Sequence, residues 1–414
     1  MMKRALRLVA ILIGLVVITA GGFAAFVAAR GIPRYAPGKV QLKAEPTPER
    51  LVRGEKLVRL LCAECHLDPV TRKLTGRRLI DAPPEFGPIV SKNITRHLEK
   101  GIGGWTDGEL AYLVRTGISR DGSYIPPYMA KLPHLADEDL ASIIAFLRSD
   151  HPLTAPAAID PPGRTQPSFL TKFLSRVAFG PLPYPTRPIS VPAPDDKVAY
   201  GRYLVVNLEC WTCHSADFKT MNVMEPEKTP GFMGGGNPMR DLGGRVVPTA
   251  NLTPDEQTGI GRWSEADFAR AVRGGVRPNG RPVLYPMGPM PELSAGDVSA
   301  IYAYLRTVPK IANAVARAEP PTPSGGSLGK QLYYRYGCYG CHGDAGLGVA
   351  DLRKGGEHYP TDEGLIAWIK NAPAIKPGTR MPQWEGVIPE AEFPILAAYV
   401  RELGANARIA DAPR

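Results

Sequence analysis

The six cysteines of the 414-residue sequence all lie in three copies of the pattern Cys-x-x-Cys-His. In this pattern the two thiols can add to the vinyl groups of a porphyrin, and the adjacent histidine takes one axial position on the iron. A zinc site needs four ligands, and no segment supplies the second cysteine pair that each site would require. The spacing therefore predicts three covalently bound haem c groups, held by Cys62, Cys65 and His66; by Cys210, Cys213 and His214; and by Cys338, Cys341 and His342.

The first two motif-bearing segments are repeats of one another. The blocks Asn93-Ile94-Thr95 and Gly101-Ile102-Gly103-Gly104-Trp105 recur as Asn251-Leu252-Thr253 and Gly259-Ile260-Gly261-Arg262-Trp263 at a constant offset of 158 residues. The cysteines are offset by only 148, so the second segment carries a ten-residue insertion, which we place in the stretch 221–244. The third segment is shorter and lacks both blocks.

Methionine thioethers are the candidate second axial ligands, and they are predicted by elimination. Met129 is the only methionine between Cys62 and Leu147, and Met381 is the only one after His342. Of six methionines in the second segment, Met287 matches Met129 through the repeat, and Met290 is its rival. A thioether gives a closed, six-coordinate iron with a raised reduction potential. The alternative for each methionine is a core-filling role.

Helical patterns surround the motifs and predict a mainly α protein. Apolar residues recur at three-to-four spacing before each Cys-x-x-Cys-His, and each segment ends in a further helical pattern, with Asp137 and Ser294 as expected N-caps for the first two. Two helices crossing beside a covalent haem form the cytochrome c plan. We therefore expect an N-terminal transmembrane helix followed by three tandem cytochrome c-like haem domains, with boundaries 1–44 anchor, 45–150 first domain, 151–194 linker, 195–310 second domain, 311–324 linker and 325–414 third domain.

The N-terminus predicts an uncleaved membrane anchor, and the alternative is a signal peptide cleaved in the small-residue stretch 24–29. Twenty-two uncharged, mostly apolar residues run from Leu8 to Ala29, enough for a helix to cross a hydrocarbon core of roughly 30 Å and longer than a typical signal-peptide core. Basic residues flank both sides, so charge alone does not orient the span. Covalent haem attachment in bacteria takes place outside the cytoplasmic membrane, which predicts periplasmic haem domains.

The formal net charge of +10 lies outside the three haem segments. Residues 45–150, 195–310 and 325–414 each carry equal numbers of basic and acidic side chains, whereas residues 1–44 carry seven basic and no acidic ones and residues 151–194 carry four and one. A positive anchor and linker favour an anionic membrane surface over a nucleic-acid partner.

The linker 151–194 is rich in proline but contains the proline-free run 168–179. Phe169, Leu170, Phe173, Leu174 and Val177 fall on one face of a helix there. Such a helix lies on a membrane, sits in a partner's groove or packs on the chain's own haem domains.

The chain resembles the three-haem cytochrome c subunits of bacterial membrane-bound periplasmic dehydrogenases of the alcohol, gluconate and aldehyde type. The resemblance rests on the three Cys-x-x-Cys-His motifs, on Asn251-Leu252-Thr253-Pro254-Asp255 with Thr258-Gly259-Ile260-Gly261-Arg262-Trp263-Ser264, and on Tyr285-Pro286-Met287 before the final helix. It covers about residues 45–405. It implies a redox partner protein and an electron carrier that is not itself an enzyme.

The sequence thus predicts a membrane-anchored, periplasmic triheme cytochrome that transfers electrons between a dehydrogenase or the quinone pool and a downstream acceptor. An alternative partner is a terminal oxidase or photosynthetic reaction centre. A multi-haem peroxidase is a third possibility, but it needs an open iron position, and a methionine on every haem argues against that.

Overall fold

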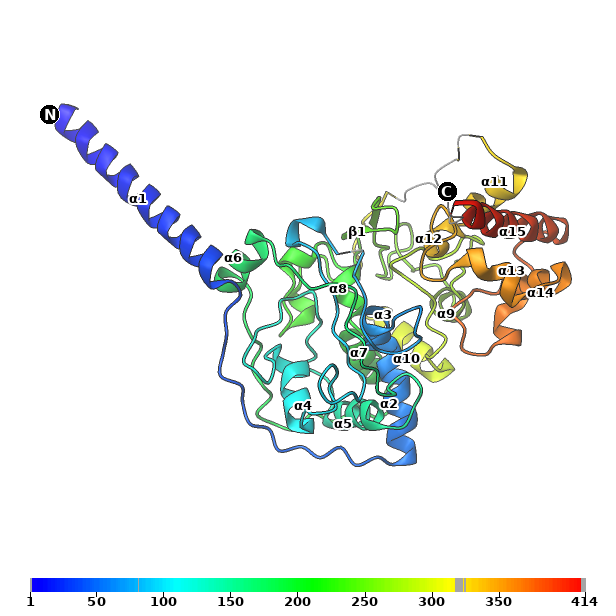
Figure 1. The fold of residues 1–414 in the computed structure, drawn as a ribbon, viewed down its shortest axis with the longest axis horizontal. Coiled ribbons are helices and arrows are strands. Elements are labelled where there is room, and N and C mark those ends of the chain that lie inside the picture. The colour runs from blue at the N-terminus through cyan, green and yellow to red at the C-terminus, as the bar shows by residue number, and fades with distance from the viewer. Residues whose placement is uncertain (1, 81, 317–322, 324, 411–414) are drawn as a thin grey trace. The chain divides into compact units, whose positions relative to one another are not determined.

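The computed structural model describes residues 2–80, 82–316, 323 and 325–410 (Figure 1). Its architecture is mainly helical, which confirms the predicted class, and its only named strands in the described chain form one short hairpin. In chain order the longer helices are α1 Met2–Arg30, α2 Pro48–Leu61, α4 Asp107–Thr116, α5 Asp137–Arg148, α6 Phe169–Val177, α7 Lys197–Asn207, α9 Glu265–Gly274, α10 Ala295–Leu305, α11 Leu328–Arg335, α14 Asp362–Ile375 and α15 Phe393–Ala410. The short ones are α3 Ala63–His66, α8 Cys210–His214, α12 Tyr339–His342 and α13 Gly355–His358, with 3-10 turns η1 Pro84–Phe86, η2 Phe218–Thr220, η3 Pro226–Lys228, η4 Leu352–Lys354 and η5 Glu390–Glu392.

The chain divides into two compact units. Unit 1 comprises Met1–Glu55 and Cys65–Ile189, and unit 2 comprises Lys56–Glu64 and Ser190–Arg414. Unit 1 therefore holds most of the first predicted haem segment together with most of the proline-rich linker. Unit 2 holds the second and third predicted segments, and half of the predicted linker 311–324 between them lies outside the described residues.

Side-chain hydrogen bonds cap the N-termini of three of the repeated helices. Capping boxes begin α4 at Thr106, α9 at Ser264 and α10 at Ser294, where the side chain accepts from the backbone N–H three residues later. The predicted cap at Ser294 is confirmed, but the one at Asp137 is wrong: Ala136 is the N-cap of α5 and makes no side-chain cap bond. Asp137 is instead paired with the buried guanidinium of Arg115 at 2.5 Å.

Each predicted haem segment contains a close crossing of its first and last helices at a glycine. A Cβ added to Gly54 would lie 2.0 Å from the carbonyl oxygen of Ser142, and one added to Gly201 would lie 1.9 Å from that of Ala300. In the third segment a Cβ on Gly329 would lie 2.6 Å from Cβ of Tyr399. Only glycine allows the backbones to approach this closely. These three glycines were not identified from the sequence.

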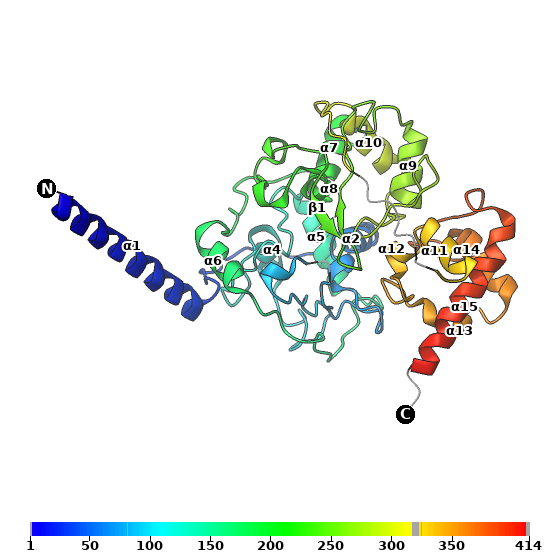
Figure 2. The same ribbon diagram turned by 90° about the horizontal axis from the view of Figure 1, so that it is seen from above.

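The third segment has its own apolar core. Leu332, Tyr333, Trp384 and Phe393 are almost completely buried in it, between α11, α14 and α15. The helical pattern predicted at the end of this segment is confirmed by α15. Figure 2 shows α11 to α15 grouped together.

The two strands β1 Pro238–Arg240 and β2 Val246–Pro248 pair antiparallel, with Met239 opposite Val247. At their turn, the Asp241 carboxylate accepts backbone N–H groups of Gly243 and Arg245 at 2.9 Å each. The hairpin therefore has a fixed tip.

The N-terminal helix α1 projects from the rest of unit 1 (Figures 1 and 2). It is long and apolar enough to cross a membrane, and within the described residues it is the one helix that meets this criterion.

Candidate haem sites

The three Cys-x-x-Cys-His motifs each end in a short helix: α3 with His66, α8 with His214 and α12 with His342. All six cysteines are partly buried and none forms a disulfide. Burial raises the pKa of Cys210 and Cys338 to about 12 and that of Cys341 to about 11. A thiol–disulfide catalyst requires a lowered cysteine pKa. The raised pKa values of these three thiols therefore argue against redox cycling of their sulfurs.

The histidine of each motif is held in one orientation by a backbone carbonyl. His66 Nδ1 lies 2.6 Å from the carbonyl oxygen of Lys92, His214 Nδ1 lies 2.8 Å from that of Ala250, and His342 Nδ1 lies 3.2 Å from that of Ala350. Because Nδ1–H donates in this arrangement, Nε2 is the nitrogen available to a metal.

Burial also lowers the pKa of all three imidazoles. A low pKa keeps the ring neutral, which is the form that binds a metal. The residues present therefore fit a haem iron, with two adjacent thiols for the porphyrin and an oriented neutral imidazole for one axial position.

The repeated asparagines explain how the carbonyl partners are positioned. Asn93 follows Lys92 and accepts the backbone N–H of Thr95 at 2.8 Å, and Asn251 follows Ala250 and accepts that of Thr253 at 2.9 Å. Both asparagines are 3% exposed, and their amide nitrogens donate to distant backbone carbonyls. The Asn-x-Thr block thus holds the loop that orients the histidine. The sequence repeat showed that this block recurs but did not indicate its role.

The backbone of the two methionine loops distinguishes Met287 from Met290. The N–H of Leu132 donates to the carbonyl eighteen residues earlier at 2.9 Å, and the N–H of Met290 makes the equivalent bond at 2.8 Å. Met290 therefore occupies the position of the core residue Leu132, which is 7% exposed. Met287 occupies the position of Met129, and both are half-buried in loops before the last helix of their segment.

In the third segment Met381 is half-buried against the apolar core, and its backbone N–H donates to Thr379 Oγ1 at 3.3 Å. This places it in a loop between α14 and α15. The ligand role of Met381 stays a prediction, as do those of Met129 and Met287.

Arg115 and Arg273 correspond through the repeat offset of 158 residues, but their environments differ. The side chain of Arg115 is fully buried, with Nη1 donating to the carbonyl of Pro133 at 3.3 Å. Its counterpart Arg273 is exposed. A shared haem contact is therefore not supported for this pair.

Within unit 2, the third attachment motif packs on the second segment. A Cβ on Gly340, between Cys338 and Cys341, would lie 2.7 Å from Cδ2 of Leu284, three residues before Met287. The guanidinium of Arg245 lies over the ring of Tyr339 at 4.9 Å and 3.6 Å from the carboxylate of Asp344. The attachment loop of the third site and the methionine loop of the second are thus neighbours.

The insertion in the second segment lies earlier than much of the predicted stretch. In the first segment the carbonyl of His66 accepts the N–H of Gly76, whereas His214 accepts that of Gly235, at 2.8 Å in each case. The interval from His214 to Gly235 is therefore eleven residues longer than that from His66 to Gly76. The interval from Gly235 to Ala250 is one residue shorter than its counterpart in the first segment.

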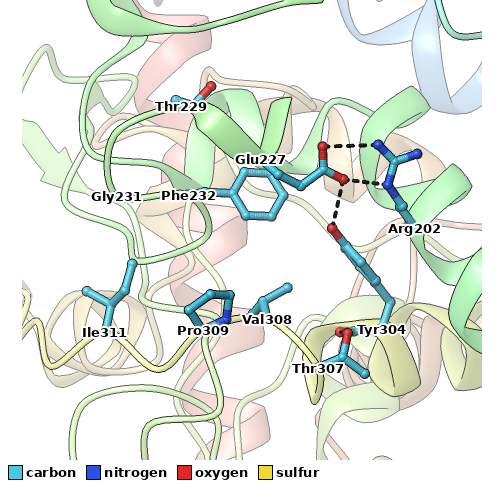
Figure 3. Close-up of a pocket in the computed structure, with 10 residues that line it drawn as sticks. All are labelled: Arg202, Glu227, Thr229, Gly231, Phe232, Tyr304, Thr307, Val308, Pro309 and Ile311. Atoms are coloured by element: carbon cyan, nitrogen blue, oxygen red, sulfur yellow. Dashed lines mark hydrogen bonds and ion pairs between the residues drawn. The ribbon is translucent and has the colours of Figure 1, made fainter. Parts of the chain in front are cut away.

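This insertion lines a cavity of about 500 Å³ with α7 and α10 (Figure 3). On its wall, Arg202 Nη2 donates to the Glu227 carboxylate at 3.0 Å, and Tyr304 Oη donates to the same group at 3.2 Å. No cysteine, histidine or methionine lines the cavity, so it is separate from the predicted haem ligands.

Three helical segments, each with an oriented histidine next to paired thiols, define a c-type cytochrome. Residues 326–400 match the family model described as cytochrome c oxidase, cbb3-type, subunit III. The chain is 29% identical over 352 residues to the fructose dehydrogenase cytochrome subunit of Gluconobacter japonicus, an alignment that covers 74% of this chain and 68% of that protein. It is 29% identical over 317 residues to the cytochrome c subunit of the quinone alcohol dehydrogenase of Gluconacetobacter polyoxogenes, covering 70% of this chain and 64% of that subunit.

A third relative is a diheme cytochrome c-type protein of Cereibacter sphaeroides, 30% identical over 267 residues that cover 60% of this chain and 82% of that protein. The chain belongs to the cytochrome c family that includes the cytochrome c subunits of bacterial membrane-bound dehydrogenases. The predicted resemblance is therefore confirmed. Because these relatives are named as cytochrome subunits, the chain is an electron-transfer protein rather than a substrate-converting enzyme.

Proposed function

We propose that this chain is a triheme c-type cytochrome, anchored by α1 in the cytoplasmic membrane with its haem segments in the periplasm. The observation that carries the proposal is the recurrence, in all three motifs, of a histidine whose Nδ1 faces a backbone carbonyl within 3.2 Å. Each haem, when bound, supplies one-electron redox chemistry. The protein's own residues attach the porphyrin edge, orient the imidazole and exclude water.

Met129, Met287 and Met381 are the proposed second axial ligands. Each lies in a loop just before the last helix of its segment, and Met290 takes the place of a core leucine. Three thioether ligands leave no position for a substrate, which favours an electron carrier over a peroxidase.

The proposed electron donor is a dehydrogenase subunit or the quinone pool. Support comes from the relatives, two of which are named as cytochrome subunits of fructose and alcohol dehydrogenases. The match of residues 326–400 to an oxidase subunit model supports a second candidate, in which the third segment delivers electrons to a terminal oxidase. The contact between Leu284 and the third attachment loop favours electron exchange between the second and third haems.

The test is a set of methionine substitutions in the full-length protein. We expect Met381→Ala to remove about a third of the thioether-to-iron absorption of the oxidised protein and to open one haem to carbon monoxide, while the unmodified protein binds none rapidly. Met287→Ala should have the same effect on a second haem.

Met290→Leu is the matched control, because leucine is the residue at this position in the first segment. It should leave the absorption unchanged. Rapid carbon monoxide binding by the unmodified protein, or turnover of hydrogen peroxide with an electron donor, would replace the carrier proposal with the peroxidase one.

A further inference from the structure

The helix α6 is attached to the C-terminal end of α1, the segment that we propose to span the membrane (Figure 1). The rings of Phe173 and Phe23 meet edge to face with centroids 6.0 Å apart. The guanidinium of Arg176 lies 4.8 Å from the ring centroid of Phe26, and its Nε donates to the carbonyl of Gly31 at 2.9 Å. This bond places a cation at the C-terminus of α1, where the helix dipole favours positive charge.

The polar face of α6, and not its apolar face, packs on the body of unit 1. Thr171 and Ser175 are buried, and Thr171 Oγ1 donates to the carbonyl of Phe86 in η1 at 2.8 Å. The N-cap Ser168 donates to the carbonyl of Glu85 at 2.6 Å. The helix is therefore fixed in orientation by hydrogen bonds on its inner side.

The opposite side of α6 presents apolar residues to the outside. Phe169, Leu170 and Val177 are 49%, 40% and 53% exposed. The ring of Phe169 stacks on that of Phe173 at 6.3 Å, so the aromatic row of α6 continues onto α1 through Phe23. A helix with its polar side satisfied and its apolar side open, continuous with a membrane span, is suited to a bilayer surface.

The depth of α6 follows from its attachment points. Phe23 and Phe26 lie in turns near the C-terminal end of α1, which ends at Arg30. A spanning α1 must place these turns at the edge of the hydrocarbon core. Because α6 contacts those turns, a spanning α1 would bring it to the boundary between the hydrocarbon core and the lipid headgroups.

Charge selects the kind of lipid. The helix carries Lys172 and Arg176 and no acidic residue, and the neighbouring residues 1–44 have no acidic side chain. Basic side chains next to a bilayer surface are attracted to anionic lipid headgroups.

We propose that α6 lies in the headgroup layer of the bilayer, with Phe169, Leu170 and Val177 at the acyl boundary and its basic side chains on anionic lipid phosphates. This inference rests on the proposed insertion of α1. It gives unit 1 a second point of attachment, which limits its rotation about α1 and sets which face it turns to the membrane.

The test is nitroxide labelling of the full-length protein in vesicles of phosphatidylcholine and phosphatidylglycerol. Leu170→Cys and Val177→Cys supply the labelled positions, and Val70→Cys, at an 86% exposed site of the same unit, is the matched control. For each label we measure the ratio of its collision rate with oxygen, which partitions into lipid, to its collision rate with a water-soluble nickel chelate. We expect this ratio to be at least threefold higher at positions 170 and 177 than at position 70. Equal accessibility at all three positions would overturn the proposal.

Two further arms separate the possible causes. If the labels at 170 and 177 become shielded from the water-soluble chelate only after a partner dehydrogenase subunit is added, then α6 binds a groove of that protein and not lipid. Extraction with alkaline carbonate tests α1 on its own: if it strips the protein from vesicles in which positions 170 and 177 were shielded, the spanning role of α1 fails while the surface role of α6 stands. If the protein instead resists extraction while the labels at 170 and 177 are not shielded, the spanning role of α1 stands and the surface role of α6 fails.

Discussion

Gly201→Ala is the sharpest test of the helix crossing that shapes the second haem segment. The new Cβ would lie 1.9 Å from the carbonyl oxygen of Ala300 and 2.9 Å from Cβ of Tyr304. A carbon and a carbonyl oxygen are comfortable at about 3.3 Å. The helices α7 and α10 would therefore have to separate by about 1.4 Å, and the obstructing atom is backbone, which cannot rotate away.

The expected cost follows from two opposing terms. Overpacking of this kind costs up to about 3 kcal/mol, and replacing glycine by alanine inside a helix returns about 1 kcal/mol. The net destabilisation of about 2 kcal/mol corresponds to about a 30-fold rise in the open population of this helix pair.

Amide hydrogen exchange with peptide resolution is the appropriate assay, because it reports opening of α7 and α10 separately from the other segments. Exchange in both helices should accelerate about 30-fold. The control is Gly274→Ala at the end of α9, where a Cβ would meet no atom within 4 Å. That change should leave exchange in α7 and α10 unaltered. If Gly201→Ala changes their exchange by less than twofold, the close crossing is wrong.

Two further predictions concern the modularity of the haem sites and the cavity wall. The double change Cys338→Ala with Cys341→Ala should give a two-haem protein that still inserts in the membrane, because attachment is local to each segment; a haem-to-protein ratio of one or zero would contradict independent segments. Burial raises the pKa of Glu227, but hydrogen bonds from Arg202, the backbone and Tyr304 together hold it below its ordinary value of 4.5. The stability that this carboxylate contributes is therefore complete above pH 4.5 and is lost as the pH falls through the lowered pKa. Exchange of residues 225–232, corrected for the intrinsic effect of pH, should accelerate on acidification in the unmodified protein but not in Glu227→Gln; equal pH profiles would show that the ion pair has no such role.

The features of this protein that depend on neighbouring residues could be predicted from its sequence. In each Cys-x-x-Cys-His motif, the reactive groups are neighbours along the chain, so their spacing alone indicates haem attachment. The helical class was predictable because apolar periodicity and caps such as Ser294 act over a few residues. The family assignment depended on the same local blocks and is confirmed by the relatives.

The N-cap of α5 could not be predicted from the neighbouring residues alone. An aspartate before an apolar run is a reasonable N-cap, but here the carboxylate is paired with Arg115, twenty-two residues earlier. A long-range ion pair thus displaced the local preference.

The crossing glycines and the carbonyl partners of the histidines depended on tertiary structure. Each is a contact between residues that the chain brings together only after folding, and glycine or a backbone carbonyl carries no side-chain signature of its partner.

The helix α6 combines both kinds of information. Its apolar face could be derived from the spacing of Phe169, Phe173 and Val177, because a helix has a fixed period. Three environments for that face remained open from the sequence. The hydrogen bonds of Thr171 and Ser168 to η1, and the contact of Phe173 with α1, determine which side is covered and which is exposed, since only packing in three dimensions decides which neighbour a helix face meets.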